Sequence, residues 1–418
     1  MKKEIGILDR KDYDKIIVPI DISKNFHKAM IVGPGGEVLE EPFEIDIYKE
    51  GFLKLLNKLK DNQFTQEKKV IFAMEPTSYY HEVMLEQLNA LGHEVQLVNP
   101  FLTAQVRKLD YDHIKTDNID CRVLGKTILI GKGKVPRNIG ENNKRLRAIT
   151  RQRQSRCNLI KIIKTQINRH IDQLWPGFVN RYNRKKGLVW NIWESQMAWA
   201  IMQICPNPNK VEKMSPENLI KLFKKHRIKQ IGIKRAEKII NHAKTVVSKS
   251  NPLPEIQENL KQDIHLLHHL NTIVSDLDNK AIKLLPDQAK YLLSIKGLSP
   301  FYSASFLAEI GDIKDFASPK QLIRYAGIII SVKESGMYKQ NSSRMTKSGN
   351  KHLRYVVMTM ARNVARCHPD FKYHYEKFIK RGMNYQKAIG CVAIKLMKTM
   401  FYLLSREEVY STDKFKSK

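Results

Sequence analysis

Two short apolar runs in the first quarter of the chain each end in an acid. Asp21 closes the run at 16–20, and Glu75 closes the run at 70–74. Runs of this length, bounded by polar residues and rich in branched side chains, predict buried strands. Open α/β sheets gather their ligands at the carboxyl ends of strands, so we expect both acids at one edge of a sheet.

The residues around these runs predict a mixed α/β domain. Three strands separated by turns are expected between residues 15 and 45. Helices are then expected over 51–60 and 81–91, alternating with strands over 70–74 and 94–98. Pro19, inside the first run, predicts that its strand lies at an edge of the sheet or is bulged there.

Two further acids, Asp117 and Asp120, follow Thr116, which is a suitable helix N-cap. Three residues apart in a first helical turn, they share one face. They either complement the helix dipole or join Asp21 and Glu75 in a single site. Gathered carboxylates repel one another unless divalent cations bridge them. The four acids therefore predict a Mg2+ site, or a Mn2+ site, suited to phosphodiester chemistry.

The composition indicates a polyanionic partner. Lysine and arginine number 73 against 42 acids, a net charge of +31. This surplus favours nucleic acid as the partner, and an apolar content of 42% excludes a disordered chain. Since the sequence shows neither an apolar leader nor a run of about 18 apolar residues, we expect a cytoplasmic protein with no membrane partner. The five scattered cysteines predict neither disulfides nor a zinc site.

A basic segment follows the α/β region. Residues 132–169 hold 12 basic residues and one acid. An apolar stripe over 160–174 predicts a long amphipathic helix that ends near Pro176. A second stripe consists of Leu266, Leu270, Ile273 and Leu277. We expect the two helices to pack as an antiparallel or intersubunit coiled coil, with basic faces along a nucleic-acid backbone.

Candidate phosphate contacts lie in several of these segments. Those before and within the long helix are Lys115, Arg147, Arg151 and Lys161. The simpler alternative for any single one of them is a solvated surface. Near residue 297 a helix stops at Gly297 and another starts after a tight turn, which would leave amides free for a phosphate.

A serine in a basic setting is the second candidate centre. Ser335 precedes a glycine, and no carboxylate occurs between Lys339 and Arg366. The nearby cations are Arg344, Lys347, Lys351 and Arg354. A hydroxyl beside phosphate-holding cations is suited to nucleophilic attack on DNA, although a plain Ser-Gly turn is the simpler explanation of the spacing alone.

The motifs together resemble a known family. The N-terminal ones are Asp21-Ile22-Ser23-Lys24, Glu75-Pro76-Thr77 with Tyr80, Asn99-Pro100, and 115–120 with the sequence KTDNID. The C-terminal ones are 297–311, Tyr325-Ala326-Gly327, Glu334-Ser335-Gly336 and 348–354 with the sequence SGNKHLR. In this order they resemble the transposases of the one-ten and eleven-eleven insertion sequences.

The resemblance implies an architecture. Residues 12–140 would form an RNase H/RuvC-like mixed-sheet DEDD domain, 141–285 a long helical coiled-coil region, 286–406 a mainly helical C-terminal transposase domain, and 407–418 a tail. The fold class is then α/β plus all-α.

The resemblance also implies a mechanism. Asp21, Glu75, Asp117 and Asp120 would hold Mg2+, and Ser335 would form a phosphoserine bond with DNA. An element-encoded guide RNA would pair with donor and target DNA, and a homo-oligomer, dimer or tetramer, would bring the acids of one subunit to the serine of another. The alternatives are a RuvC-like endonuclease that acts on DNA junctions through metal-bound water, and a non-catalytic RNA- and DNA-binding protein.

Overall fold

The computed structural model describes most of the chain in two units, Met1–Asn138 and Ile139–Lys418. The described residues are 15–61, 68–76, 79–110, 116–137, 139–179, 188–189, 191–226, 231–248, 253–329, 334–335, 338–339 and 345–413. Lys115 and Arg344 lie outside them, and the structure describes the backbone but not the side chain of Ser335. The two units are considered separately.

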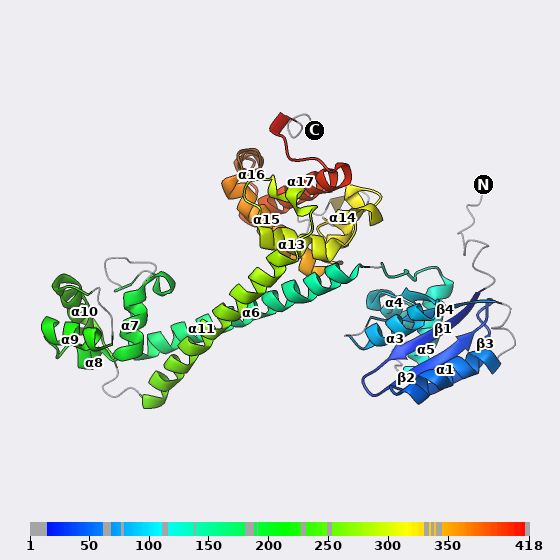
Figure 1. Ribbon diagram of the computed structural model, residues 1–418, viewed down its shortest axis with the longest axis horizontal. Coiled ribbons are helices and arrows are strands. Elements are labelled where there is room, and N and C mark those ends of the chain that lie inside the picture. Colours follow the sequence, from blue (N-terminus) through cyan, green and yellow to red (C-terminus); the bar gives the residue numbers. More distant parts are fainter. Residues whose placement is uncertain are drawn as a thin grey trace. The chain divides into compact units, whose positions relative to one another are not determined.

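The first unit is built on a five-stranded mixed sheet (Figure 1). Its strands are β1 (Lys15–Ile22), β2 (Phe26–Val32), β3 (Val38–Asp46), β4 (Lys69–Met74) and β5 (Glu94–Leu97). The order is β3-β2-β1-β4-β5, in which β1, β4 and β5 are parallel and β2 and β3 run antiparallel to their neighbours. The predicted opening meander and mixed α/β order are confirmed.

Helices cover both faces of this sheet because the strands are apolar on both sides. The helices are α1 (Lys49–Asp61), α3 (Tyr80–Ala90), α4 (Pro100–Asp110) and α5 (Asp117–Leu129). On one face Ile16, Val18 and Ile20 pack with buried residues of α1 and α3. On the other face Ile17 packs with Leu124 of α5.

Pro19 lies in the central strand, so the predicted edge or bulge is wrong. Strand β1 pairs with β4 through Pro19 itself, and its register with β2 is the same before and after it, at Ile17 with Val32 and at Ile20 with Ala29. The missing proline amide is thus tolerated without a shift of register. A Cβ added at Gly125 of α5 would lie 3.4 Å from the Pro19 ring, so this glycine lets α5 approach the sheet closely.

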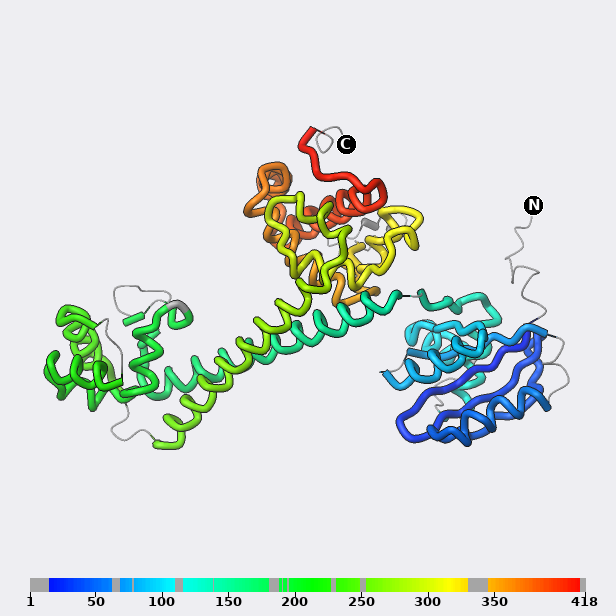
Figure 2. Tube along the Cα trace, viewed as in Figure 1, coloured from blue at the N-terminus to red at the C-terminus, as the bar shows by residue number. Residues whose placement is uncertain are grey.

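The second unit begins with two long helices that pack side by side, α6 (Glu141–Leu174) and α11 (Pro254–Lys283). They run antiparallel, because Leu146 shares a core with Ala281 while Ile171 shares one with Leu260. Figure 2 traces the same pair in opposite directions. The predicted stripe on the second helix is partly wrong, since Leu266 is exposed and its neighbour Leu267 is buried.

One end of this pair carries a small helical core. It contains η2 (Ile192–Glu194), α7 (Gln196–Ile204), α8 (Pro208–Val211), α9 (Pro216–Lys225) and α10 (Ile233–Thr245). Trp175 is fully buried at its centre, and its indole Nε1 donates to His242 Nδ1 at 3.1 Å. The helices therefore join the ends of α6 and α11 in a continuous apolar core.

The other end carries a larger helical core. Its elements are α12 (Ala289–Leu293), α13 (Pro300–Ile310), η3 (Ile313–Asp315), α14 (Pro319–Ala326), β6 (Glu334–Ser335), β7 (Tyr338–Lys339), α15 (Lys351–Cys367), α16 (Pro369–Lys380) and α17 (Tyr385–Arg406). Within the described residues α17 alone is long and apolar enough to cross a membrane by length and composition. Most of that stretch is buried in the core formed with α14 and α15, which gives no indication of a membrane protein.

Candidate active site

Asp21 and Glu75 lie at the same edge of the mixed sheet. Ile20 of β1 pairs in parallel with Met74 of β4, so the next residue of each strand is one of these acids. This is the carboxyl edge at which parallel strands present functional groups. The predicted placement of the two strand acids is confirmed.

The first turn of α5 carries the other two acids. Thr116 caps the helix, its hydroxyl accepting from the Ile119 amide at 3.3 Å. Asp120 is largely buried against the unit, whereas Asp117 is exposed. The predicted cap and first-turn position are confirmed, but the two acids differ in burial.

Helix α4 contacts two of the acids with one face. Arg107 donates to Asp120 at 2.5 Å, and the Thr103 hydroxyl donates to Glu75 at 2.7 Å. Thr103 and Arg107 are four residues apart, so they lie one above the other on α4. Glu75 and Asp120 therefore flank the same stretch of this helix.

Cys121, the residue after Asp120, is fully buried. Its thiol donates to the Lys28 carbonyl at 3.1 Å. Burial raises the pKa of the Cys121 thiol to about 12, and the negative charges of Asp21 and Asp120 add to the shift. The Cys121 thiol thus lies within electrostatic reach of Asp21 and Asp120.

The donor chemistry of this edge fits a hard divalent cation, since carboxylate oxygens are the ligands that Mg2+ prefers. However, the side chains do not converge on one point as the ligands of a metal ion would. Asp120 pairs with Arg107 and Glu75 with Thr103, and no three acidic, histidine or cysteine side chains among the described residues converge as a metal site. Asp21 and Glu75 thus lie at one sheet edge, and a guanidinium occupies the carboxylate of Asp120.

Two of the predicted phosphate contacts bind the protein itself. Arg151 makes a bidentate ion pair with Glu309 of α13, in which its Nε and Nη2 donate to the two carboxylate oxygens at 2.8 and 2.9 Å. Arg147 donates to the carbonyls of Ala308 and Glu309 at 3.0 and 3.1 Å. These arginines therefore connect α6 to the end of α13, a contact that the sequence patterns did not indicate. Their contact with nucleic acid remains a prediction.

Glu309 is the centre of this network. Its side chain is only 2% exposed and also accepts from the side-chain Nδ2 of Asn350 at 2.7 Å. Burial by itself would raise the pKa of Glu309, but the bonds from Arg151 and Asn350 outweigh it and hold that pKa below its usual range. The sequence signal was a lone acid in an otherwise apolar helix, a pattern typical of a paired buried carboxylate.

The remaining basic candidates have different surroundings. Arg354 donates to the carbonyls of Ala326 and Lys347, at 3.0 and 3.1 Å, and so also serves a structural role. Lys161, Lys347 and Lys351 are exposed. These three lysines are therefore accessible to a phosphate.

Ser335 is carried by a segment whose two ends are held together. We call residues 330–345 the serine segment; within it Ser335 of β6 pairs with Tyr338 of β7. At its base the Thr346 amide donates to the Ile329 carbonyl at 2.8 Å, and the Asn350 amide donates to the Tyr325 carbonyl at 2.8 Å.

Two glycines allow this close backbone approach. A Cβ at Gly349 would lie 2.5 Å from the Tyr325 oxygen, and one at Gly327 would lie 2.9 Å from the Ser348 oxygen. The Ala-Gly and Ser-Gly-Asn motifs thus meet in space, and Asn350 joins them to Glu309 while it caps α15.

The Gly297 turn is also packed against the protein. Gly297 has a φ of +102°, and a Cβ there would lie 3.3 Å from Cys367 of α15. The following helix is capped by Ser299, whose hydroxyl accepts from the Tyr302 amide at 3.4 Å. The turn is therefore explained by close helix packing, and its contact with phosphate remains a prediction.

Comparison with known proteins matches both units. Residues 18–176 match a family of DEDD transposases of the IS110 type, and residues 289–376 match the family described as Transposase IS116/IS110/IS902. Together the two segments cover more than half of the chain. The acidic mixed sheet and the helical unit are thus parts of a transposase.

Similar proteins come from two bacteria. A Streptomyces coelicolor protein named as a mini-circle transposase for IS117 is 24% identical over 378 residues, which is 87% of each chain. A Pseudomonas aeruginosa protein named as a family 20 transposase is 24% identical over 165 residues, 38% of this chain and 47% of that protein. The chain belongs to the IS110 family of insertion-sequence transposases.

Proposed function

We propose that the protein is the recombinase of an insertion sequence, which cleaves and rejoins DNA strands through a covalent bond to Ser335. The observation that carries the proposal is that Asp21 and Glu75 follow paired residues of adjacent parallel strands while one helix, α4, contacts both Glu75 and Asp120, in a chain of a transposase family. The strongly basic composition supports DNA as the substrate.

In the proposal the four acids hold Mg2+, or Mn2+ in its place. Asp21, Glu75 and Asp120 would supply the inner ligands and the exposed Asp117 an outer one. The bound cation would stabilise charge on the phosphoryl oxygens and lower the proton affinity of the attacking oxygen. Arg107 must then release Asp120, since a guanidinium and a metal ion need the same lone pairs.

Ser335 supplies the attacking oxygen. An Oγ–P bond forms, one P–O bond to a sugar breaks, the serine proton is lost, and the departing sugar oxygen takes up a proton. Because a phosphodiester is present before and after the step, the reverse attack by another sugar hydroxyl rejoins the strands without ATP. The exposed Lys347 and Lys351, which follow the serine segment in the chain, are suited to hold the phosphate.

The proposed partners follow from the resemblance. An element-encoded guide RNA would pair with donor and target DNA. A homodimer or tetramer would bring the acidic edge of one subunit to Ser335 of another. The basic surplus of the chain supports binding of two polyanions at once.

The decisive experiment follows a DNA-protein adduct. Full-length protein is mixed with Mg2+, labelled DNA spanning the element ends, and RNA transcribed from the noncoding DNA beside the gene. Wild type should give an adduct that resists SDS, and Ser335→Ala should lose it while still binding DNA. A Ser335→Ala protein that cleaves as fast as wild type would overturn the serine assignment in favour of hydrolysis by metal-bound water, and omission of the RNA tests guidance.

A further inference from the structure

A groove with aromatic walls lies on the first unit, on the side of the sheet that α1 and α3 cover. Its volume is about 740 Å³, and it is lined by the residues that follow β1, by the start of α1 and by the start of α3. None of the four acids lines it. Yet Lys24 of the groove follows Asp21 by three residues, and Tyr79 follows Glu75 by four.

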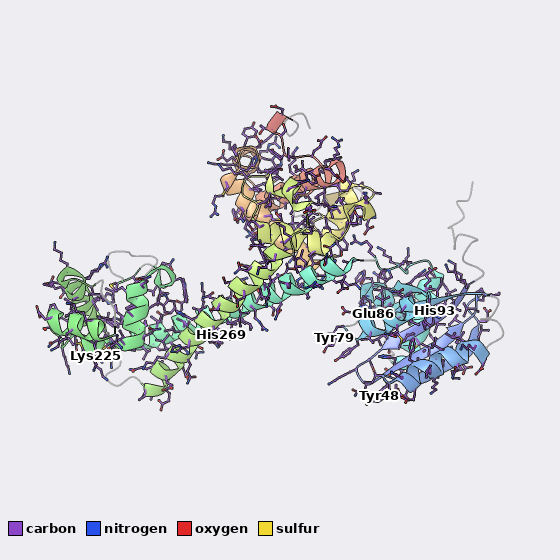
Figure 3. The ribbon with its side chains drawn as sticks, viewed as in Figure 1. Tyr48, Tyr79, Glu86, His93, Lys225 and His269 are labelled. Atoms are coloured by element: carbon purple, nitrogen blue, oxygen red, sulfur yellow. The ribbon has the colours of Figure 1, made fainter. Side chains whose placement is uncertain are left out.

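The walls expose aromatic rings that the fold does not bury. Tyr48 is 69% exposed and Tyr79 is 65% exposed (Figure 3). Tyr79 and its neighbour Tyr80 lie with ring centroids 4.7 Å apart at 43°. Exposed rings that line one hollow commonly mark a binding site, since a ligand stacked there removes apolar area from water.

The charges at the rim favour an anionic ligand. Lys24 and Lys49 are both exposed in the groove. The acid of the groove, Asp46, accepts from the Tyr48 amide through Oδ1 at 2.9 Å, just before α1 begins. Burial lowers the pKa of His27, which keeps that imidazole neutral near pH 7.

We propose that this groove binds unpaired nucleotides, with bases stacked on Tyr48 and Tyr79 and phosphates near Lys24 and Lys49. Aromatic faces combined with backbone cations are the usual means of holding single strands. A paired base presents only its edges, so stacking requires a strand that has left its duplex. The inference rests on the proposed function only in that the strand would lead to the acidic edge, where a phosphodiester is cleaved.

The test measures binding of short oligonucleotides to the full-length protein in EDTA, so that it depends on neither the metal nor Ser335. Three probes are used: a single-stranded DNA that contains the fluorescent base 2-aminopurine, the same strand with abasic sites, and the corresponding blunt-ended duplex. Tyr48→Ala with Tyr79→Ala should weaken single-strand binding about tenfold or more, by the strength of base stacking. The 2-aminopurine quenching seen with wild type should also disappear.

Matched variants separate stacking from folding. Tyr48→Phe with Tyr79→Phe keeps the rings and should bind like wild type. Tyr373→Ala removes an equally exposed ring from α16 and should change nothing. Duplex affinity should stay within twofold for all variants.

The proposal is overturned if the alanine pair binds single strands as wild type does, if it loses duplex binding equally, or if abasic and intact strands bind alike. Loss of self-association with unchanged single-strand affinity would also overturn it, and would assign the groove to a second copy of the chain. These outcomes are independent of the Ser335 adduct, so either proposal can fail alone.

Discussion

The guanidinium of Arg107 lies 2.5 Å from the carboxylate of Asp120, and the two side chains are 21% and 16% exposed. A guanidinium and a divalent cation compete for the same oxygens. Arg107→Ala should therefore tighten Mn2+ binding several-fold, as measured by isothermal titration calorimetry of the full-length protein.

Two variants on α5 calibrate this measurement. Asp120→Asn removes a proposed ligand and should weaken Mn2+ binding. Arg122→Ala removes a more exposed arginine, paired with Glu41, and should leave the affinity unchanged. Equal affinities of wild type and Arg107→Ala would contradict competition at Asp120.

The buried Glu309 should make the stability of the second unit dependent on pH. Its folded pKa lies below the unfolded value of about 4.3, so its contribution is present above that pH and is lost as the pH falls through the folded pKa. Glu309→Gln should cost about 1.5 to 3 kcal/mol at pH 7, because the buried side chain loses its charge-assisted hydrogen bonds with Arg151 and Asn350.

Thermal melts between pH 3 and 8 check this. The variant should melt lower at pH 7 and show a shallower decline on acidification. Glu376→Gln, which changes an exposed glutamate on α16, should follow wild type at every pH. Parallel curves for Glu309→Gln and wild type would rule out the linkage.

The proposed sharing of sites between subunits predicts complementation. Asp120→Asn and Ser335→Ala should each be inactive alone. Mixed so that subunits exchange, they should recover part of the wild-type adduct, since one site in a mixed dimer then combines intact acids with an intact serine. Recovery indistinguishable from zero, with exchange shown by native mass spectrometry, would place both halves in one subunit.

A salt titration should distinguish the exposed lysines from Arg151, which is paired with the buried Glu309. Neutralising Lys161, Lys347 or Lys351 to glutamine should reduce the slope of log K against log salt by about 0.9 for each phosphate that the variant no longer binds, with little effect on melting. Arg151→Gln should instead lower the melting temperature. Lys225→Gln, on the exposed side of α9, serves as the control. A lysine triple variant with the wild-type slope would leave these residues as plain surface.

The sequence predicted the acidic edge because strand period and helix capping are local properties. Asp21 and Glu75 each close an apolar run, and Thr116 precedes a helical pattern, so their positions follow from neighbouring residues. Arg107 was missed because its pairing with Asp120 depends on how α4 packs beside α5, which no short spacing encodes.

Two further structural features were missed for related physical reasons. Arg147 and Arg151 look like solvent-facing cations on a basic helix, but their partner Glu309 lies more than 150 residues away in the chain. Leu266 fits an apolar stripe as well as Leu267 does, because several leucines and histidines alternate there, and only contact with α6 selects the buried one.

The antiparallel pair of α6 and α11 has a further consequence, because it belongs to two hydrophobic cores, one at Ile171 and Leu260 and one at Leu146 and Ala281. Each residue of a helix adds about 1.5 Å and turns the chain by about 100°. One extra residue in each helix would rotate one core relative to the other by about a quarter turn. Seven extra residues would lengthen the pair by about 10 Å and keep the same apolar positions facing each other. The length of the α6–α11 pair should therefore change by whole heptads, and the distance between the two cores should differ among members of this family in steps of about 10 Å.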